Sequence, residues 1–113
     1  MISSSFTHEI THLHAEICSA LSDARRILIL YTLSGTPLNV SDVANQVNIS
    51  QPSASRHLTI LRERGMVAAQ RDGQFVVYKI ADERIIQALD LLRSVLASNL
   101  RNKALLVNNV LET

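Results

Sequence analysis

A change of hydrophobic period at Gly65 constrains the fold more than any other feature of the sequence. Before this glycine, residues 51–64 carry apolar side chains at helical spacing, and Ser50 and Pro52 favour a helix start. After it, residues 66–80 follow a shorter period and are rich in Val, Phe and Tyr, as strands are. The chain therefore passes from a helix directly into β-structure.

This β-structure is predicted to be a hairpin of residues 66–71 and 74–80. Asp72 and Gly73 separate the two runs, and an Asp-Gly pair in such a place is a strong hairpin signal. A type I′ turn needs positive φ at both central residues, which these residue types tolerate. We expect Asp72 and Gly73 to form that turn.

Four further helices are expected from apolar residues that recur at spacings of three and four. Their predicted ranges are 6–21, 24–33, 42–47 and 82–111. Ser22 or Asp23 can cap the second of these and Ser41 the third, because their oxygens accept hydrogen bonds from free backbone amides. Gly35 and Pro37 predict a loop between them. The predicted fold class is mainly α with a two-stranded β-hairpin.

Length and composition favour one folded domain. The chain has 113 residues, of which 47% are hydrophobic and 19% charged. We expect a single domain over residues 1–113, with residues 1–5 and the last few residues frayed. Cys18 is the single cysteine and no secretory leader is evident, which favours a reducing, cytoplasmic setting. The apolar run 27–31 is far shorter than the ~20 residues that cross a bilayer, so no membrane association is expected.

Positive charge gathers in the middle of the chain. Residues 51–79 carry five basic side chains against two acidic ones, whereas residues 1–50 carry two against four and residues 80–113 are balanced. Two helices joined by a tight turn, followed by a hairpin, have the order of a winged helix-turn-helix. The middle third is therefore predicted to bind double-stranded DNA.

A helix that enters the major groove needs short side chains and hydrogen-bonding groups near its N-terminus. The helix over residues 51–64 has both, and the alternative is a polar face that is merely solvated. In the wing, Arg71 and Lys79 suit phosphates, and the alternative is a charged hairpin edge. Of Arg25 and Arg26, we expect one to pair with a nearby carboxylate and the other to face a phosphate. The predicted DNA-binding residues are Gln51, Ser53, Ser55, Arg56, His57 and Arg71.

Several segments form a set that is more specific than a helix-turn-helix alone. They are LSDARR (21–26), SQPSASRHL (50–58), LR (61–62), GMV (65–67) and RDG (71–73), with Tyr78. As a set they resemble the ArsR/SmtB family of small dimeric repressors, densely over residues 21–82. The resemblance implies five helices with a two-stranded wing and a homodimer joined by the first and last helices. It also implies a two-fold symmetric operator that is released when an inducer binds.

The sequence supports a homodimer independently of the resemblance. Helices 6–21 and 82–111 each offer an apolar stripe, and the last helix is longer than a small domain needs. Further apolar residues extend the stripe of the last helix: Leu105, Leu106, Val107, Val110 and Leu111. A two-fold dimer places its recognition helices about one DNA turn, ~34 Å, apart.

The metal ligands that the resemblance implies are missing. One family site has a Cys-x-Cys pattern near residues 43–47, where this chain has no cysteine. A second has four ligands on the last helix, of which Asp82 is kept. Arg84, Val95 and Ser98 occupy the other three positions. One cysteine also excludes an intrasubunit dithiol sensor, so we expect no cofactor at these positions.

The first helix holds the remaining candidate ligands. His8, His12 and Glu16 share a face at helical spacing and are candidates for Ni²⁺ or Zn²⁺, and the alternative is a solvated face. His14 and Cys18 lie at the border of the apolar stripe, as an interface edge would. Cys18 is expected to be a small buried hydrophobic residue, with a reactive thiol or an intersubunit disulfide as the alternative.

Together these features predict a cytoplasmic, homodimeric, sequence-specific DNA-binding transcriptional repressor. The alternative is a winged-helix module that binds another protein and no DNA. An enzyme is not expected, because no nucleophile with a base, phosphate-binding loop or paired carboxylates occurs at useful spacing. The predicted partners are double-stranded DNA and a second copy of the chain.

Overall fold

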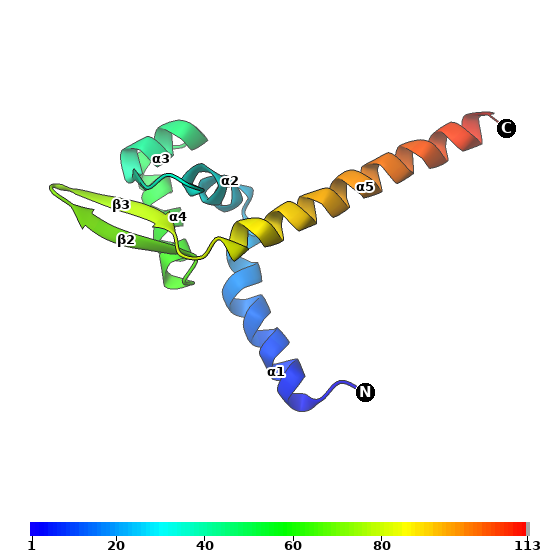
Figure 1. The fold of residues 1–113 in the computed structure, drawn as a ribbon, viewed down its shortest axis with the longest axis horizontal. Coiled ribbons are helices and arrows are strands. Elements are labelled where there is room, and N and C mark those ends of the chain that lie inside the picture. The colour runs from blue at the N-terminus through cyan, green and yellow to red at the C-terminus, as the bar shows by residue number, and fades with distance from the viewer. Residues whose placement is uncertain (113) are drawn as a thin grey trace. The chain divides into compact units, whose positions relative to one another are not determined.

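The computed structural model describes residues 1–112. Two compact units make up the chain: Met1–Glu83, and the last helix, α5 (Arg84–Glu112) (Figure 1). The side chains of Val110 and Leu111 lie outside the described residues. Of the last few residues, which were predicted to fray, Thr113 lies outside them too, whereas α5 continues to Glu112. The expectation of a single domain stays a prediction.

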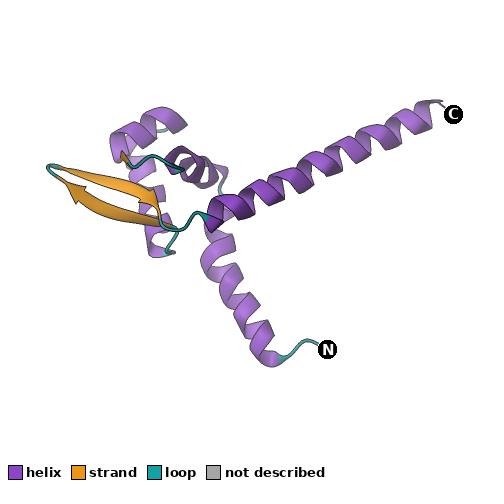
Figure 2. Ribbon diagram, in the orientation of Figure 1, coloured by secondary structure: helices purple, strands orange, loops and turns teal. Residues whose placement is uncertain are grey.

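Helices dominate the first unit, and the hairpin is its main β-structure (Figure 2). Its α-helices are α1 (Ser4–Leu13), α2 (Ala24–Leu33), α3 (Val40–Val47) and α4 (Gln51–Glu63). Between α1 and α2 lie a π-helical segment, η1 (His14–Cys18), and a 3₁₀ segment, η2 (Ser19–Ser22). Its strands are β1 (Leu38–Asn39), β2 (Val67–Asp72) and β3 (Phe75–Ile80). The predicted class, mainly α with a β-hairpin, is confirmed.

The first predicted helix, residues 6–21, is helical but is not one regular α-helix. Ser3 begins it by accepting a hydrogen bond from the amide of Phe6 at 3.1 Å. At η1 the turn widens, and at η2 it tightens to about three residues per turn. These changes rotate the side chains after Leu13 away from the face that a regular 3.6-residue period would give them.

Side-chain caps set the starts of α2 and α3. Asp23, one of the two predicted caps, begins α2 by accepting a hydrogen bond from the backbone amide two residues later at 2.9 Å. α3 begins at Val40, two residues before the predicted range. The reason is that Asn39, and not Ser41, is its cap and accepts from the amide of Asp42 at 2.9 Å.

The predicted ends of α4 are confirmed. Ser50 caps the helix, and its Oγ accepts a hydrogen bond from the amide of Ser53 at 3.2 Å. Gly65 follows the helix with a φ of 73°, and the amide of Met66 donates to the carbonyl of Leu61 at 2.9 Å. This returning bond satisfies a carbonyl that the helix end leaves free and leads the chain into β2.

The β2–β3 hairpin is confirmed, but its turn lies one residue later than predicted. Asp72 pairs with Phe75, so Gly73 and Gln74 are the central residues. Of these two only Gly73 has a positive φ, 61°, which fits a type II′ turn and not the predicted type I′ turn. β1 adds a short third strand antiparallel to β3, where the sequence predicted a loop, and the sheet order is β1-β3-β2.

The core of the first unit lies between α2, α3, α4 and the start of β2. The predicted stripe of α4, Ala54, Leu58 and Leu61, is fully buried. The largest fully buried side chains are Ile29, Leu30, Leu33, Val43, Leu58, Leu61 and Met66. Full burial of each such side chain stabilises the fold by about 1.5–3 kcal/mol. The core therefore holds α4 firmly by one side and leaves its other side free.

The last helix, α5, begins at Arg84, two residues after the predicted start at Asp82. Its exposed apolar side chains include Leu92, Leu96 and Leu100, each four residues after the last, and further exposed apolar side chains follow at Leu105, Leu106 and Val107. None of the helices within residues 1–112 combines the length and the hydropathy that a membrane crossing requires.

Replacement of the α4 cap tests this account of the fold. Ser50→Ala removes the acceptor of the Ser53 amide, so we expect the free energy of unfolding to fall by about 1 kcal/mol. Urea unfolding followed by circular dichroism measures the change. Ser55→Ala, the same substitution at an exposed position inside α4, is the control and should leave stability nearly unchanged. Equal stability of the two variants would contradict the cap.

Candidate nucleic-acid interface

The five residues predicted to lie on the outer face of α4 differ in their exposure to solvent. Gln51, Ser55 and Arg56 are exposed. Ser53 is half-buried, and its Oγ is covered without a hydrogen-bond partner among the described residues. His57 is only 3% exposed. The first three therefore form the outer face, and their DNA contacts stay predictions.

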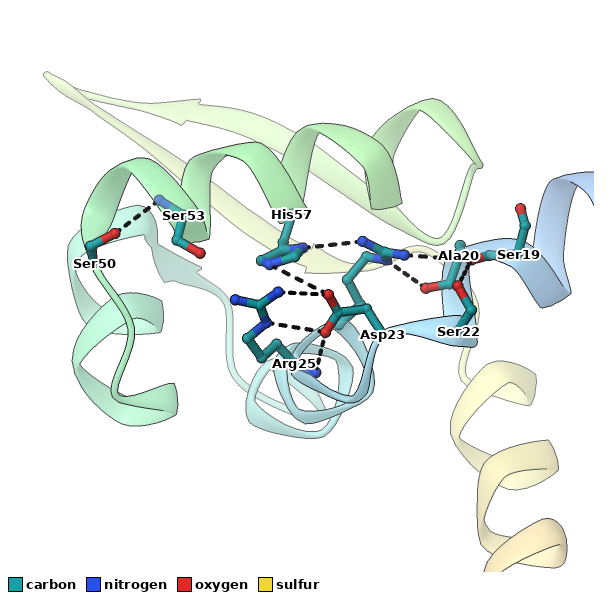
Figure 3. Close-up of polar contacts among 9 residues, drawn as sticks. Ser19, Ala20, Ser22, Asp23, Arg25, Ser50, Ser53 and His57 are labelled. Carbon is teal, nitrogen blue, oxygen red and sulfur yellow. Dashed lines mark hydrogen bonds and ion pairs between the residues drawn. The ribbon is translucent and has the colours of Figure 1, made fainter.

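The position of His57 corrects the expectation that it shares the exposed face. His57 comes three residues after Ala54 and directly before Leu58, so the helical period turns it toward the core. Its ring faces Asp23, which lies between η2 and α2, and Arg25 in the first turn of α2 (Figure 3). A side chain in this place can act on the outer face only through the helix itself.

The contacts of His57 determine which of its nitrogens carries the proton. Nη1 of Arg26 lies 3.2 Å from Nδ1 of His57. A guanidinium can only donate, so Nδ1 must accept and the proton of the neutral ring is assigned to Nε2. That Nε2 is buried, has no hydrogen-bond partner among the described residues, and lies 4.0 Å from Oδ2 of Asp23.

The electrostatic surroundings keep this ring neutral. Burial lowers the pKa of His57 below its ordinary value of 6.5, and the carboxylate of Asp23 opposes that effect. The positive charges of Arg25, Arg26 and Arg56 lower it further. The pKa of Asp23 itself lies well below its usual range, chiefly because Arg25 donates hydrogen bonds to its carboxylate.

Arg25 and Arg26 take two different roles, one of which was predicted. Arg25 pairs with Asp23 through two bonds, Nη2 to Oδ2 at 2.8 Å and Nε to Oδ1 at 3.1 Å. Arg26 is half-buried and donates to the main chain, from Nε to the carbonyl of Ala20 at 2.6 Å and from Nη2 to that of Ser19 at 3.4 Å. We expected one arginine of the pair to face a phosphate. Arg26 is instead turned inward, toward the main chain of η2.

The wing adds residues that the sequence did not single out. Arg71 and Lys79 are exposed, as predicted. Between the hairpin and the helices runs a groove of about 480 Å³. Its lining is mostly uncharged and polar: Asn39, Ser41, Gln51, Ser55, Gln74 and Tyr78, with Val40, Phe75 and Val76. Phe75 is 61% exposed, and an apolar residue at a hairpin tip was the only sequence signal for this surface.

The first helix does not bring its candidate ligands together. Oε2 of Glu16 pairs with Nη1 of Arg64 at 3.2 Å. Within the part of the chain that the structure describes, no three His, Cys, Asp or Glu side chains gather closely enough to hold a metal ion. Cys18 is exposed in the single chain, which differs from the expectation of a buried thiol.

The sequence is similar to those of known bacterial transcriptional regulators. A sequence profile described as "Bacterial regulatory protein, arsR family" matches residues 23–69. The HTH-type transcriptional regulator NmtR of Mycobacterium tuberculosis is 36% identical over 76 residues, which cover 67% of this chain and 63% of NmtR. The transcriptional repressor SdpR of Bacillus subtilis is 39% identical over 64 residues, 57% of this chain and 71% of SdpR. The match thus spans less than two thirds of NmtR and more than two thirds of SdpR.

A solved structure gives the same result for the fold. It is a homodimeric winged helix-turn-helix DNA-binding domain from Mycobacterium bovis, described as a possible ArsR-family transcriptional regulator. The TM-score is 0.76 at 27% sequence identity, and the match covers 88% of this chain and 93% of that one. The winged helix-turn-helix fold is therefore confirmed for this chain.

The buried histidine makes stability depend on pH in a predictable direction. Because the pKa of His57 is lower in the folded chain than its ordinary value of 6.5, the unfolded chain takes up the proton first as the pH falls. The contribution of His57 is fully present above about pH 6.5 and is lost below it. We expect the free energy of unfolding to fall as the pH is lowered below about 6.5.

His57→Asn, which cannot titrate, should lose less stability over the same interval in urea unfolding. His12→Asn, at an exposed histidine, is the control and should keep the wild-type pH dependence. The same pH dependence in the wild type and in His57→Asn would contradict the assignment.

Proposed function

The chain belongs to the ArsR family of bacterial regulatory proteins, which are DNA-binding transcriptional regulators, and we propose that it acts as a homodimeric repressor that occupies promoter DNA. The observation that carries this proposal is the exposed row of Gln51, Ser55 and Arg56 on a helix whose other side is fully buried. SdpR is named a repressor, and the Mycobacterium bovis domain is named homodimeric and DNA-binding. As a regulator of bacterial promoters, the chain would work in the cytoplasm.

In this proposal the N-terminal half of α4 enters the major groove. Arg56 suits the O6 and N7 atoms of guanine, and Gln51 suits the N6 and N7 atoms of adenine. Ser55 is short enough to let the backbone approach the base edges, and Ser53 lies at the half-buried margin of this face. The amides at the helix start carry a partial positive charge, about half an elementary charge, that favours a phosphate nearby.

The wing and its groove supply the second contact. The groove between the hairpin and α4 is lined by hydroxyl and amide groups, which are common partners of phosphate and sugar oxygens. Arg71 adds a positive charge on the exposed hairpin. One DNA strand running along the groove would contact α4 on one side and the wing on the other.

The homodimer is proposed from apolar surface that a single chain leaves open. On α1, Phe6, Ile10 and Leu13 are exposed, and on α5 the stripe through Leu92 and Leu96 is exposed as well. Monomeric proteins rarely expose such continuous apolar surface, because water disfavours it. Covering both helices with a second copy by two-fold symmetry would pair two recognition helices for the two half-sites of an operator.

The metal positions of the family do not fit this chain. Asp82 is the one ligand kept, and Arg84, Val95 and Ser98 offer no set of donors for a divalent cation. On the first helix Glu16 is already paired with Arg64. We therefore propose that DNA binding and release use no metal at the family positions on the last helix.

The major-groove role is tested by Arg56→Ala. Duplexes enriched from a random-sequence library by the wild-type protein serve as probes in fluorescence anisotropy. We expect the variant to bind its best duplex ~1–3 kcal/mol more weakly, because a base-edge contact is lost. Arg101→Ala, which removes the same charge from α5, is the control and should bind as the wild type does.

Two results would count against the proposal in different ways. Unchanged affinity of Arg56→Ala would remove that residue from base readout. A wild-type protein that shows no salt-dependent binding to any duplex would instead favour the protein-interaction module without DNA binding.

The dimer is tested on α5. Leu96→Glu places a charge in the exposed apolar stripe, where burial against a second copy would be costly. We expect sedimentation velocity to find the variant as a monomer, with weakened DNA binding. Ser94→Glu is the control. It adds the same charge about 200° around the helix from Leu96, outside the apolar stripe, and should leave the dimer intact. A dimeric Leu96→Glu protein would exclude this stripe from the interface.

A further inference from the structure

We propose that Arg26 and His57 are positioning residues that fix the recognition helix α4 against the end of the first helix and so set the half-site spacing that the dimer accepts. The proposal rests on the proposed function, a homodimer that binds DNA. It concerns two residues that lie behind the DNA-contacting face of α4 and have no part in base readout.

One guanidinium joins two segments that are far apart in the sequence. Nε and Nη2 of Arg26 donate to the carbonyls of Ala20 and Ser19 in η2, at 2.6 and 3.4 Å. Nη1 of the same group lies 3.2 Å from Nδ1 of His57 on α4. The guanidinium is planar and its donors have fixed directions, so these three contacts fix the position of α4 relative to η2.

Each partner in this bridge needs the others. The carbonyl of Ala20 lies near the end of η2, where no further turn supplies an amide donor, and a cation there also matches the helix dipole. The carbonyl of Ser19 accepts from the hydroxyl of Ser22 at 2.6 Å as well as from Arg26, so the bond to Ala20 is the one that depends on Arg26. His57 is buried, so no water can readily replace Arg26 as the donor to Nδ1. Removal of either side chain leaves a polar group in the interior without a partner.

Asp23 completes the arrangement from the other side of the ring (Figure 3). Its carboxylate caps α2, holds Arg25, and faces Nε2 of His57 at 4.0 Å. The ring thus lies between a donor at Nδ1 and a carboxylate at Nε2, which defines its orientation. The groups that face it are Asp23, Arg25, Arg26 and Arg56. Burial and the three arginines lower the pKa of His57 and so favour the neutral ring, which can accept at Nδ1, whereas Asp23 acts in the opposite direction.

These directional contacts add what apolar packing cannot provide. Ala54, Leu58 and Leu61 determine which side of α4 is buried, but apolar contact is non-directional and tolerates a small rotation or tilt. A hydrogen bond at 3.2 Å weakens steeply when its angle changes. Arg56 directly precedes His57 on α4. A rotation of α4 about its own axis would therefore move Arg56 and would also change the angle of the hydrogen bond to His57.

The bridge ends on the helix that carries part of the proposed dimer face. η2 continues α1, on which Phe6, Ile10 and Leu13 are exposed. A tilt of α4 relative to this helix is doubled across a two-fold axis, since both copies tilt. One base pair shifts a half-site by ~3.4 Å along the DNA and by about a tenth of a turn around it. If the angle of α4 is less well defined, the dimer should therefore accept other spacings between the two DNA half-sites.

The experiment compares operators that differ only in spacing. A palindromic duplex selected by the wild-type protein is altered by inserting or removing one central base pair. The ratio of dissociation constants, altered over selected duplex, is measured by anisotropy for the wild type and for Arg26→Lys, His57→Leu and His57→Asn. Thermal unfolding is recorded in parallel. A fraction of unfolded protein scales both constants equally, so stability alone does not move the ratio.

We expect the wild type to bind the altered duplexes about ten-fold or more weakly than the selected one. Arg26→Lys and His57→Leu should reduce this ratio to about two- or three-fold, chiefly by weaker binding to the selected duplex. His57→Asn should keep much of the wild-type ratio, because the amide oxygen can accept from Arg26 where Nδ1 does. Arg25→Lys, in the same cluster but outside the bridge, is the matched control and should leave the ratio unchanged.

Wild-type ratios in Arg26→Lys and His57→Leu would overturn the proposal. If His57→Leu does not fold, Arg26→Lys and His57→Asn decide the question. A wild-type protein that binds no duplex is a separate outcome, since it refutes the proposed function itself.

Discussion

The whole structure depends on one requirement of α4, which must bury one side completely and leave the other free. Ala54, Leu58 and Leu61 are inaccessible to solvent, whereas Gln51 and Arg56 on the same helix are exposed. A 13-residue helix satisfies both demands only when its caps hold its ends and its apolar stripe has a continuous core to meet. α2, α3 and β2 supply that core, and the sharp turn at Gly65 lets β2 follow at once.

A partly buried polar cluster lies beside this apolar core and has a different role. Apolar burial supplies most of the stabilisation, but it defines orientation poorly. The group of Asp23, Arg26 and His57 contributes less net free energy because its members lose hydration, yet its bonds have fixed directions. The cluster lies where η2, α2 and α4 meet, so its directional bonds act on three elements together. In this proposal, the contacts of Arg26 and His57 on the inner side of α4 define the orientation of its exposed face.

Local signals in the sequence predicted most of the fold, and long-range contacts account for most of what was missed. Ser50, Gly65 and the apolar spacing of α4 act within one helix, and α2 began and ended where predicted. β1 has two residues and exists because β3 lies beside it, which no local pattern reveals. His57 was placed on the outer face because it is polar. Its burial depends on Arg26, 31 residues earlier, although the spacing from Ala54 was a usable local hint.

The apolar stripe of α5 includes a position at which the resemblance implies a metal ligand. Val95 stands where the resemblance implies a ligand, and it is exposed next to Leu92 and Leu91 at spacings of three and four. A histidine there would interrupt the stripe with a polar ring, whereas valine continues it. At this position the chain thus has an apolar side chain where the resemblance implies a ligand. In the proposed homodimer this position would therefore serve assembly, and the residues proposed to contact DNA, on α4 and the wing, belong to the other compact unit of the chain.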